Sequence, residues 1–314
     1  MSPLSTSSRS SPPQQAKELP IRKLFPAAPL RPKSPESHAL TIFQAFGAPL
    51  PAFQLADDFD PTLGRHISSG TVLGTKPPEY WTDLGVARHL ESADLYLSKP
   101  EVKAYLGRHS TPSLEPTFRV RREADIVLYT YSHLTHAVNM ALGGAIFPDK
   151  IQMTAELQAG AAGSQLRPDF TWRDADSSTA DAFAILEVKI PGGIDLDALD
   201  SAERSKPNGT NGFNHQNDMV NTVKQLTAYA RNQSFDTCYV GSFDGEHLLL
   251  CIFSQDAETN PLMRATIVPC QGDRGVNARK ALLGWLIEAR KEKRRGNNEG
   301  LGVGPPIKKL PARR

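Results

Sequence analysis

Two short segments carry the strongest signal in this chain: Pro168-Asp169-Phe170-Thr171-Trp172 and, after a polar stretch, Ala184-Ile185-Leu186-Glu187-Val188-Lys189. Each segment is typical of a β-strand, and the second is apolar enough to be buried on both faces. Because side chains alternate along a strand, Glu187 and Lys189 share one face and Val188 lies on the other. If the two strands are neighbours, the carboxylates of Asp169 and Glu187 converge with the ammonium of Lys189. Such a group suits a hard divalent cation with a cationic side chain beside it.

The sequence around these segments predicts one α/β domain built on a mixed sheet. Apolar periodicity predicts helices over residues 82–106, with a break near Pro100, and over 123–142, 214–231 and 277–295. Thr82 is the expected N-cap of the first helix, and Gly143-Gly144 ends the second. Strands are predicted over residues 151–158, 165–172, 182–190, 237–243 and 247–253, with Asp244-Gly245 as a hairpin turn between the last two.

The 314 residues divide into four parts by composition. Residues 1–38 are rich in Pro, Ser and basic residues and are predicted to be disordered. Residues 39–122 are predicted to form an N-terminal arm with helices, and its irregular first part, residues 39–74, is expected to pack on the body or on a partner. Residues 123–295 hold the predicted α/β domain, and residues 296–314 are a basic flexible tail.

Charge is distributed unevenly along the chain, although the net charge is only +2. Residues 1–33 carry six Lys or Arg against one Glu, residues 288–314 carry nine against three Glu, and the remainder holds 21 basic and 30 acidic residues. Basic ends on an acidic body suit a nucleic-acid partner, because flexible cations attract phosphate. Solvated tails that confer solubility are the alternative. The cluster from Lys291 to Arg295 is compatible with a nuclear-import signal, a phosphate-binding arm or a solvated helix end.

Cysteine content and hydropathy indicate the cellular compartment in which the protein works. Cys238, Cys251 and Cys270 have neither zinc-finger spacing nor the even count of a disulfide framework, which indicates a reducing, intracellular environment. No apolar run approaches the roughly 20 residues of a membrane span, and residues 1–13 lack the apolar core of a secretory signal. We therefore expect an intracellular protein without a membrane partner. The sequence indicates no oligomeric state.

The order of helix, three strands, helix and strand, with Pro168-Asp169 and Glu187-Val188-Lys189 on successive strands, resembles the PD-(D/E)XK nuclease superfamily. Gln225-Leu226-Thr227-Ala228-Tyr229 on the next helix is similar to the Gln-x-x-x-Tyr motif of its RecB-like members, and its two ends share one helix face. The resemblance covers residues 123–253. It implies a restriction-endonuclease-like αβββαβ core around a mixed sheet, with an irregular or helical N-terminal extension.

The resemblance also implies an activity: hydrolysis of phosphodiester bonds in nucleic acid, with DNA as the expected substrate and Mg²⁺ or Mn²⁺ as the cofactor. Asp169 and Glu187 are the expected metal ligands, together with the backbone carbonyl of Val188. Lys189 is expected to orient the attacking water or to stabilise charge in the transition state. The expected task of the Gln225 and Tyr229 side chains is to position water, phosphate or the DNA backbone.

A further acidic ligand is expected on the first helix of the domain. Glu123 is the best-placed candidate and Asp125 is the alternative, although both also suit the first turn of a helix for electrostatic reasons alone. Glu156, on the strand before Asp169, could be another ligand or a surface residue. His133 and His136 are three residues apart on a helix, but no third nitrogen or sulfur ligand accompanies them. We therefore expect them to be core or surface histidines.

Each motif has a structural explanation as well. Asp169 could be a turn or capping residue, Glu187 and Lys189 could form a surface ion pair, and Gln225 and Tyr229 could face solvent and core. The apolar residues around Glu187 argue against a surface pair, because they predict burial, and buried charges need partners. At the level of function, the alternative is a catalytically silent PD-(D/E)XK fold that binds nucleic acid or another protein.

Overall fold

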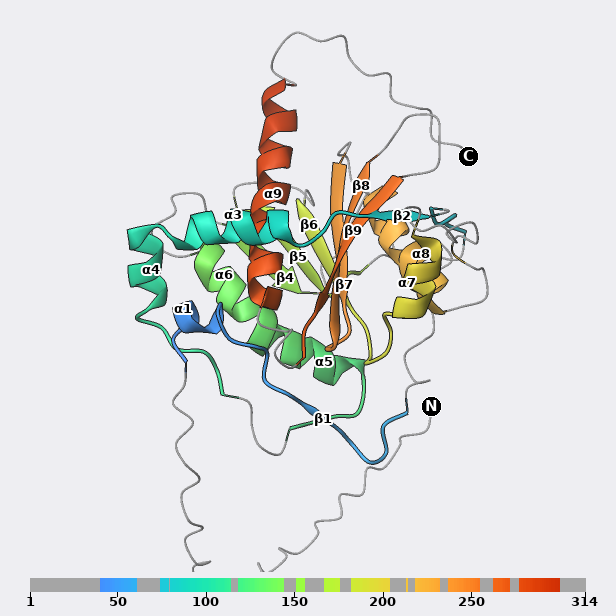
Figure 1. The fold of residues 1–314 in the computed structure, drawn as a ribbon, viewed down its shortest axis with the longest axis horizontal. Coiled ribbons are helices and arrows are strands. Elements are labelled where there is room, and N and C mark those ends of the chain that lie inside the picture. The colour runs from blue at the N-terminus through green and yellow to red at the C-terminus, as the bar shows by residue number, and fades with distance from the viewer. Residues whose placement is uncertain are drawn as a thin grey trace, which may run out of the picture. The chain divides into compact units, whose positions relative to one another are not determined.

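A seven-stranded mixed sheet is the centre of the fold in this computed structural model (Figure 1). Its strands, in spatial order, are β2 (Trp81–Asp83), β9 (Leu262–Pro269), β8 (His247–Ser254), β7 (Thr237–Phe243), β6 (Ala184–Val188), β5 (Phe170–Asp174) and β4 (Ile151–Ala155). The pairs β2–β9 and β6–β7 are parallel, and the other four are antiparallel. The predicted mixed α/β arrangement is therefore confirmed.

The structure describes residues 40–60, 74–78, 80–113, 118–143, 151–155, 167–175, 182–203, 213, 218–231, 237–254, 262–271 and 277–299. All of them belong to the unit that spans Ala39–Arg314. The predicted disordered segment, residues 300–314 of the predicted basic tail, Glu156 and the ends of several predicted elements lie outside these residues. Residues 296–299, which were expected to belong to the flexible tail, instead continue the last helix, which ends at Glu299. Within the described segments, no helix combines the length and hydrophobicity needed to cross a membrane.

Helices cover both faces of the sheet and enclose two hydrophobic clusters (Figure 1). One face packs against α1 (Ile42–Ala45), α3 (Ala87–Leu97), α4 (Pro100–Leu106), α5 (Glu123–Tyr129), α6 (His136–Gly143) and α9 (Ala278–Glu299). The other face packs against α7 (Leu196–Ala202) and α8 (Asp218–Arg231). A single π-helical segment, η1 (Thr130–Thr135), joins α5 to α6, so the helix predicted over residues 123–142 is continuous.

Strand β6 explains why the fold forms around the sequence Ala184 to Val188. All five of its residues are buried, and successive side chains enter opposite clusters. Leu186 and Val188 belong to the cluster under α6 and α9, whereas Ile185 belongs to the cluster under α8. Each such apolar side chain contributes about 2 kcal/mol on burial. By the same alternation, Glu187 faces α8 from within an otherwise apolar strand.

The segment before Glu123 is tied to the sheet and its helices. The Arg279 side chain of α9 donates hydrogen bonds to the carbonyls of Ala45 and Ala48 at 2.9 and 3.0 Å, and the Tyr129 hydroxyl donates to the Pro51 carbonyl at 2.6 Å. Further along, β1 (Gln54–Leu55) pairs in parallel with β3 (Arg119–Val120), which leads directly into α5. The described part of the arm therefore packs on the body, which is one of the two expected arrangements.

Two local expectations were wrong. Thr82 does not cap a helix but lies in β2, where it pairs with Arg264 of β9, and the first helix begins only at Ala87. Gly85 intervenes with a positive φ of 66°, a backbone conformation that glycine adopts without strain. Strand β9 was not predicted. The role of Thr82 arises from pairing between segments about 180 residues apart, which outweighs the local helical periodicity, whereas β9 also pairs along its whole length with the preceding strand β8.

Burial of His133 gives the fold an expected pH dependence. Burial and the nearby Arg279 lower the pKa of His133 from 6.5 to about 4. Between these values the unfolded chain binds more protons than the folded one, so stability falls as the pH falls from 6.5 towards 4. Replacing His133 with glutamine should remove this contribution, about 1–2 kcal/mol between pH 7 and pH 5. Urea unfolding at both pH values measures it, and an equal pH-induced loss in wild type and His133→Gln would rule it out.

Candidate functional site

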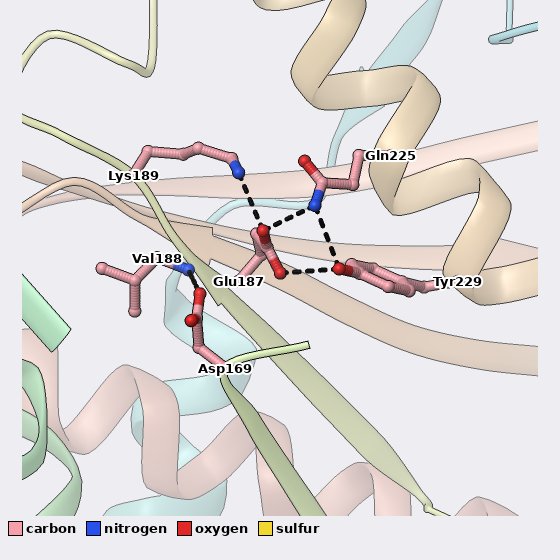
Figure 2. Close-up of polar contacts among 6 residues, drawn as sticks. All are labelled: Asp169, Glu187, Val188, Lys189, Gln225 and Tyr229. Carbon is pink, nitrogen blue, oxygen red and sulfur yellow. Dashed lines mark hydrogen bonds and ion pairs between the residues drawn. The ribbon is translucent and has the colours of Figure 1, made fainter. Parts of the chain in front are cut away.

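The two predicted acidic residues meet at the carboxyl end of β6 (Figure 2). Strands β5 and β6 are antiparallel with Phe170 opposite Leu186, so Asp169, one residue earlier, comes level with Glu187, one residue later. The Val188 N–H donates a 2.7 Å hydrogen bond to Oδ2 of Asp169 instead of continuing the ladder. The sheet register therefore places both carboxylates at one point.

Glu187 is the centre of a hydrogen-bond network (Figure 2). It is only 5% exposed. Its Oε1 accepts from Lys189 Nζ at 2.8 Å and from Gln225 Nε2 at 2.6 Å, and its Oε2 accepts from the Tyr229 hydroxyl at 2.9 Å. Gln225 Nε2 also lies 3.0 Å from the Tyr229 hydroxyl. A buried carboxylate is tolerated only with such partners, and three different side chains supply them here.

Helix α8 supplies two of these partners because Gln225 and Tyr229 are one turn apart on the face that packs on the sheet. Tyr229 is buried in the cluster that contains Leu226 and Ile185, and only its hydroxyl reaches Glu187. Burial raises the pKa of the Tyr229 phenol, and the negative charge of Glu187 adds to this effect. The phenol therefore stays protonated and acts as a donor to the carboxylate.

Lys189 is held in place by the turn that follows β6. Its N–H donates to the Phe243 carbonyl at 2.8 Å, which continues the pairing with β7. The turn then folds back so tightly that a Cβ on Gly193 would lie 2.7 Å from Cβ of Lys189. The fully buried Asp244 secures the end of the turn, since its Oδ2 accepts from the Ile194 N–H at 3.0 Å. The sequence indicated Asp244 only as part of a hairpin turn, because its second role depends on a contact 50 residues away.

Burial and, after it, repulsion between the carboxylates disfavour the charged form of Asp169. Burial, followed by the negative charge of Glu187 and a smaller contribution from Glu123, raises the pKa of Asp169 to about 8. The Val188 N–H and the Lys189 ammonium act in the opposite direction but do not compensate. A divalent cation bound between the carboxylates would offset this repulsion.

Lys189 and Glu123 belong to the same electrostatic group. Burial alone would lower the pKa of Lys189, but the carboxylates of Glu187, Glu123 and Asp169 outweigh burial and raise it. The ammonium is therefore charged. For Glu123, burial raises the pKa while Lys189 lowers it. Glu123 thus lies within electrostatic reach of the site although it comes from α5.

The structure separates the two acidic candidates on α5. Asp125 caps the helix, because its Oδ2 accepts from the backbone N–H groups of Arg121 and Arg122 at 2.9 and 3.1 Å. Glu123 is half-buried and interacts electrostatically with Lys189 and Glu187. Of these two residues, Glu123 is the one that belongs with the site.

The donor set fits a hard cation. Carboxylate oxygens from Asp169 and Glu187, with the carbonyl of Val188 directly after Glu187, are the ligand type that Mg²⁺ and Mn²⁺ prefer. Among the described residues, no three His, Cys, Asp or Glu side chains are grouped closely enough to hold a metal by themselves. Mg²⁺ commonly binds through one or two carboxylates and keeps several waters, so two carboxylates suffice.

Comparison with known proteins adds no further constraint: no family model, no curated protein and no solved structure matches the chain.

Proposed function

We propose that this chain is a metal-dependent nuclease of the PD-(D/E)XK type, which hydrolyses phosphodiester bonds of nucleic acid, with DNA as the substrate. The observation that carries the proposal is the group formed by Asp169, Glu187, Lys189, Gln225 and Tyr229 at the end of β6. The five residues come from the adjacent strands β5 and β6, or the positions that flank them, and from α8, in the order that the superfamily resemblance requires.

Asp169 and Glu187 would hold Mg²⁺ or Mn²⁺, with the Val188 carbonyl as a further oxygen donor, and Glu123 would add negative charge near the cation. When bound, the cation supplies charge neutralisation at the phosphate and lowers the pKa of a coordinated water. In the reaction, a water oxygen forms a bond to phosphorus while the bond to the leaving oxygen breaks. The water gives up one proton to solvent, and the leaving oxygen takes up one proton from solvent and departs as an alcohol.

The remaining residues are placed to stabilise negative charge on the phosphate and to orient the groups that react. The Lys189 ammonium, 2.8 Å from Glu187, can stabilise negative charge that develops on phosphate oxygens or orient the attacking water. The amide nitrogen of Gln225 is engaged with Glu187 and Tyr229, while its carbonyl oxygen points away from them (Figure 2) and can accept from water. Tyr229 fixes the orientation of Glu187 by donating to its second oxygen.

The proposed nucleic-acid partner rests on the charge of the chain ends. Residues 1–33 and 288–314 are strongly basic, whereas the remainder of the chain is acidic. Basic segments would supply the attraction to phosphate that the acidic body lacks. The same clusters favour a nuclear location as part of this proposal.

A catalytically silent member of the same fold is the second candidate. Two observations favour it: both oxygens of Glu187 already accept hydrogen bonds, and no three metal-binding side chains are grouped among the described residues. In this case the network around Glu187 would stabilise the fold, and the protein would bind nucleic acid or another protein without cutting.

A cleavage assay on four labelled substrates separates these candidates: single- and double-stranded DNA and RNA, each with Mg²⁺, Mn²⁺ or EDTA. We expect cleavage of DNA with either metal and none with EDTA. Lys189→Ala should reduce the rate by about a hundredfold or more, the scale of lost transition-state stabilisation by a positioned charge. Lys76→Ala, at an exposed lysine, is the matched control and should behave like wild type. An inactive wild type that still binds nucleic acid would favour the silent module.

A further inference from the structure

Ser242 is a buried polar residue in an otherwise apolar part of β7. It has no solvent exposure, and its hydroxyl has no hydrogen-bond partner among the residues that the structure describes. Leaving a buried hydroxyl without a partner destabilises a fold, so such groups are uncommon and call for an explanation.

The position of Ser242 in the sheet supplies that explanation. Strands β6 and β7 are parallel, and Ser242 is the register partner of Glu187. Cys238 and Val240, four and two residues before Ser242, pack in the cluster under α8. Alternation therefore directs Ser242 to the α8 face, which is also the face of Glu187. Neighbouring strands lie about 4.8 Å apart, so Ser242 and Glu187 project side by side from the same face of the sheet, although the hydroxyl and the carboxylate make no direct hydrogen bond.

Asp169, Glu187 and Ser242 thus form one row across three adjacent strands, on the face covered by Gln225 and Tyr229. The known partners of Glu187 come from α8 and from the residue after β6, and none comes from β7. The hydroxyl is the polar group that β7 brings to this row.

We propose that Ser242 is a positioning residue of the site, whose hydroxyl holds a water molecule against the Glu187 carboxylate in the outer shell of the bound cation. This inference rests on the proposed function, because it assigns a partner to the cation site. A hydroxyl can donate to one group and accept from another, which suits a water that bridges the strand and the carboxylate. Groups that orient a metal ligand typically change metal affinity or activity 10–100-fold when removed.

The test compares Ser242→Ala with Thr266→Val in the full chain. Thr266 is also a buried hydroxyl residue of the same sheet, but its hydroxyl donates to the Gly85 carbonyl at 3.1 Å, away from the site. Calorimetric titration with Mn²⁺ gives the dissociation constant, and thermal unfolding without metal gives the melting temperature. Ser242→Ala should bind Mn²⁺ about tenfold more weakly, with a melting temperature equal to or above that of wild type. Thr266→Val should melt at a lower temperature and bind Mn²⁺ as wild type does.

The outcomes distinguish this inference from the proposed function. If wild type binds Mn²⁺ and Ser242→Ala binds it equally well, Ser242 has no positioning role but the metal site stands. A lower melting temperature for Ser242→Ala would show that the hydroxyl has a partner within the fold, which also overturns the inference. The proposed metal site itself fails if wild type shows no saturable Mn²⁺ binding, or if Glu187→Gln binds Mn²⁺ as wild type does. The inference then fails with it.

Discussion

Glutamine in place of Glu187 is expected to reduce metal-dependent cleavage by about a thousandfold or more while the protein still folds. The carboxylate charge is what attracts the cation, and metal ions contribute several kcal/mol of transition-state stabilisation to phosphoryl transfer. Glutamine has the same shape, so its carbonyl oxygen can still accept from Lys189 or Tyr229. The loss should therefore appear in the rate and in Mn²⁺ affinity rather than in the folded structure.

Single-turnover cleavage rates and circular dichroism measure the two parts of this expectation. Glu91→Gln, at an exposed residue of α3, is the matched control and should leave both unchanged. A Glu187→Gln protein that cleaves within tenfold of the wild-type rate would show that Glu187 does not hold the cation. A variant that fails to fold would instead show that the network around Glu187 is needed for stability first.

Alanine in place of Gly284 is expected to destabilise the protein by about 3 kcal/mol or more, or to prevent folding. Gly284 of α9 packs directly on the backbone of α3, where an added Cβ would clash with the carbonyl group of His89. Neither partner can relieve this clash by a side-chain rotation, so the two helices would have to separate. Their separation would break the contacts of the buried Glu288 with Arg88 and Ser92, at 2.9 and 3.0 Å.

Urea unfolding of Gly284→Ala, with Gly47→Ala as control, tests the close approach of α3 and α9. A Cβ on Gly47 would meet its nearest neighbour, the Gln44 carbonyl oxygen, at an ordinary 3.6 Å. The control should therefore change the free energy of unfolding by less than about 1 kcal/mol. Equal stability of Gly284→Ala and wild type would mean that the helices are further apart than described.

The strands that carry the site could be predicted because the residues of each strand are sufficient to identify it as a strand. Ala184 to Val188 is apolar on both faces, which identifies a central strand without knowledge of its neighbours. The hairpin between Phe243 and His247 follows from Gly245, which adopts the positive φ of 89° that its turn requires. The convergence of Asp169 with Glu187 followed from the assumption that their strands are neighbours, which the pairing of Phe170 with Leu186 satisfies.

The features that could not be predicted depend on contacts between distant segments. Thr82 has the residue type of a helix cap, but its pairing with Arg264 makes it part of a strand. Asp244 has the residue type of a turn, and its bond to the Ile194 N–H appears only when the turn after Lys189 is in place. Ser242 is an ordinary strand residue until the register sets it beside Glu187. In each case the local sequence is compatible with two roles, and only the sheet decides between them.

The most direct test of the proposed metal-dependent site is the rate at which the full chain cleaves an end-labelled DNA as Mg²⁺ is titrated from zero in EDTA-treated buffer. We expect no cleavage without metal, a rate that rises to saturation with Mg²⁺, and loss of that response in Glu187→Gln. Cleavage that persists in EDTA, or a Mg²⁺ response that is the same in Glu187→Gln and wild type, would contradict it.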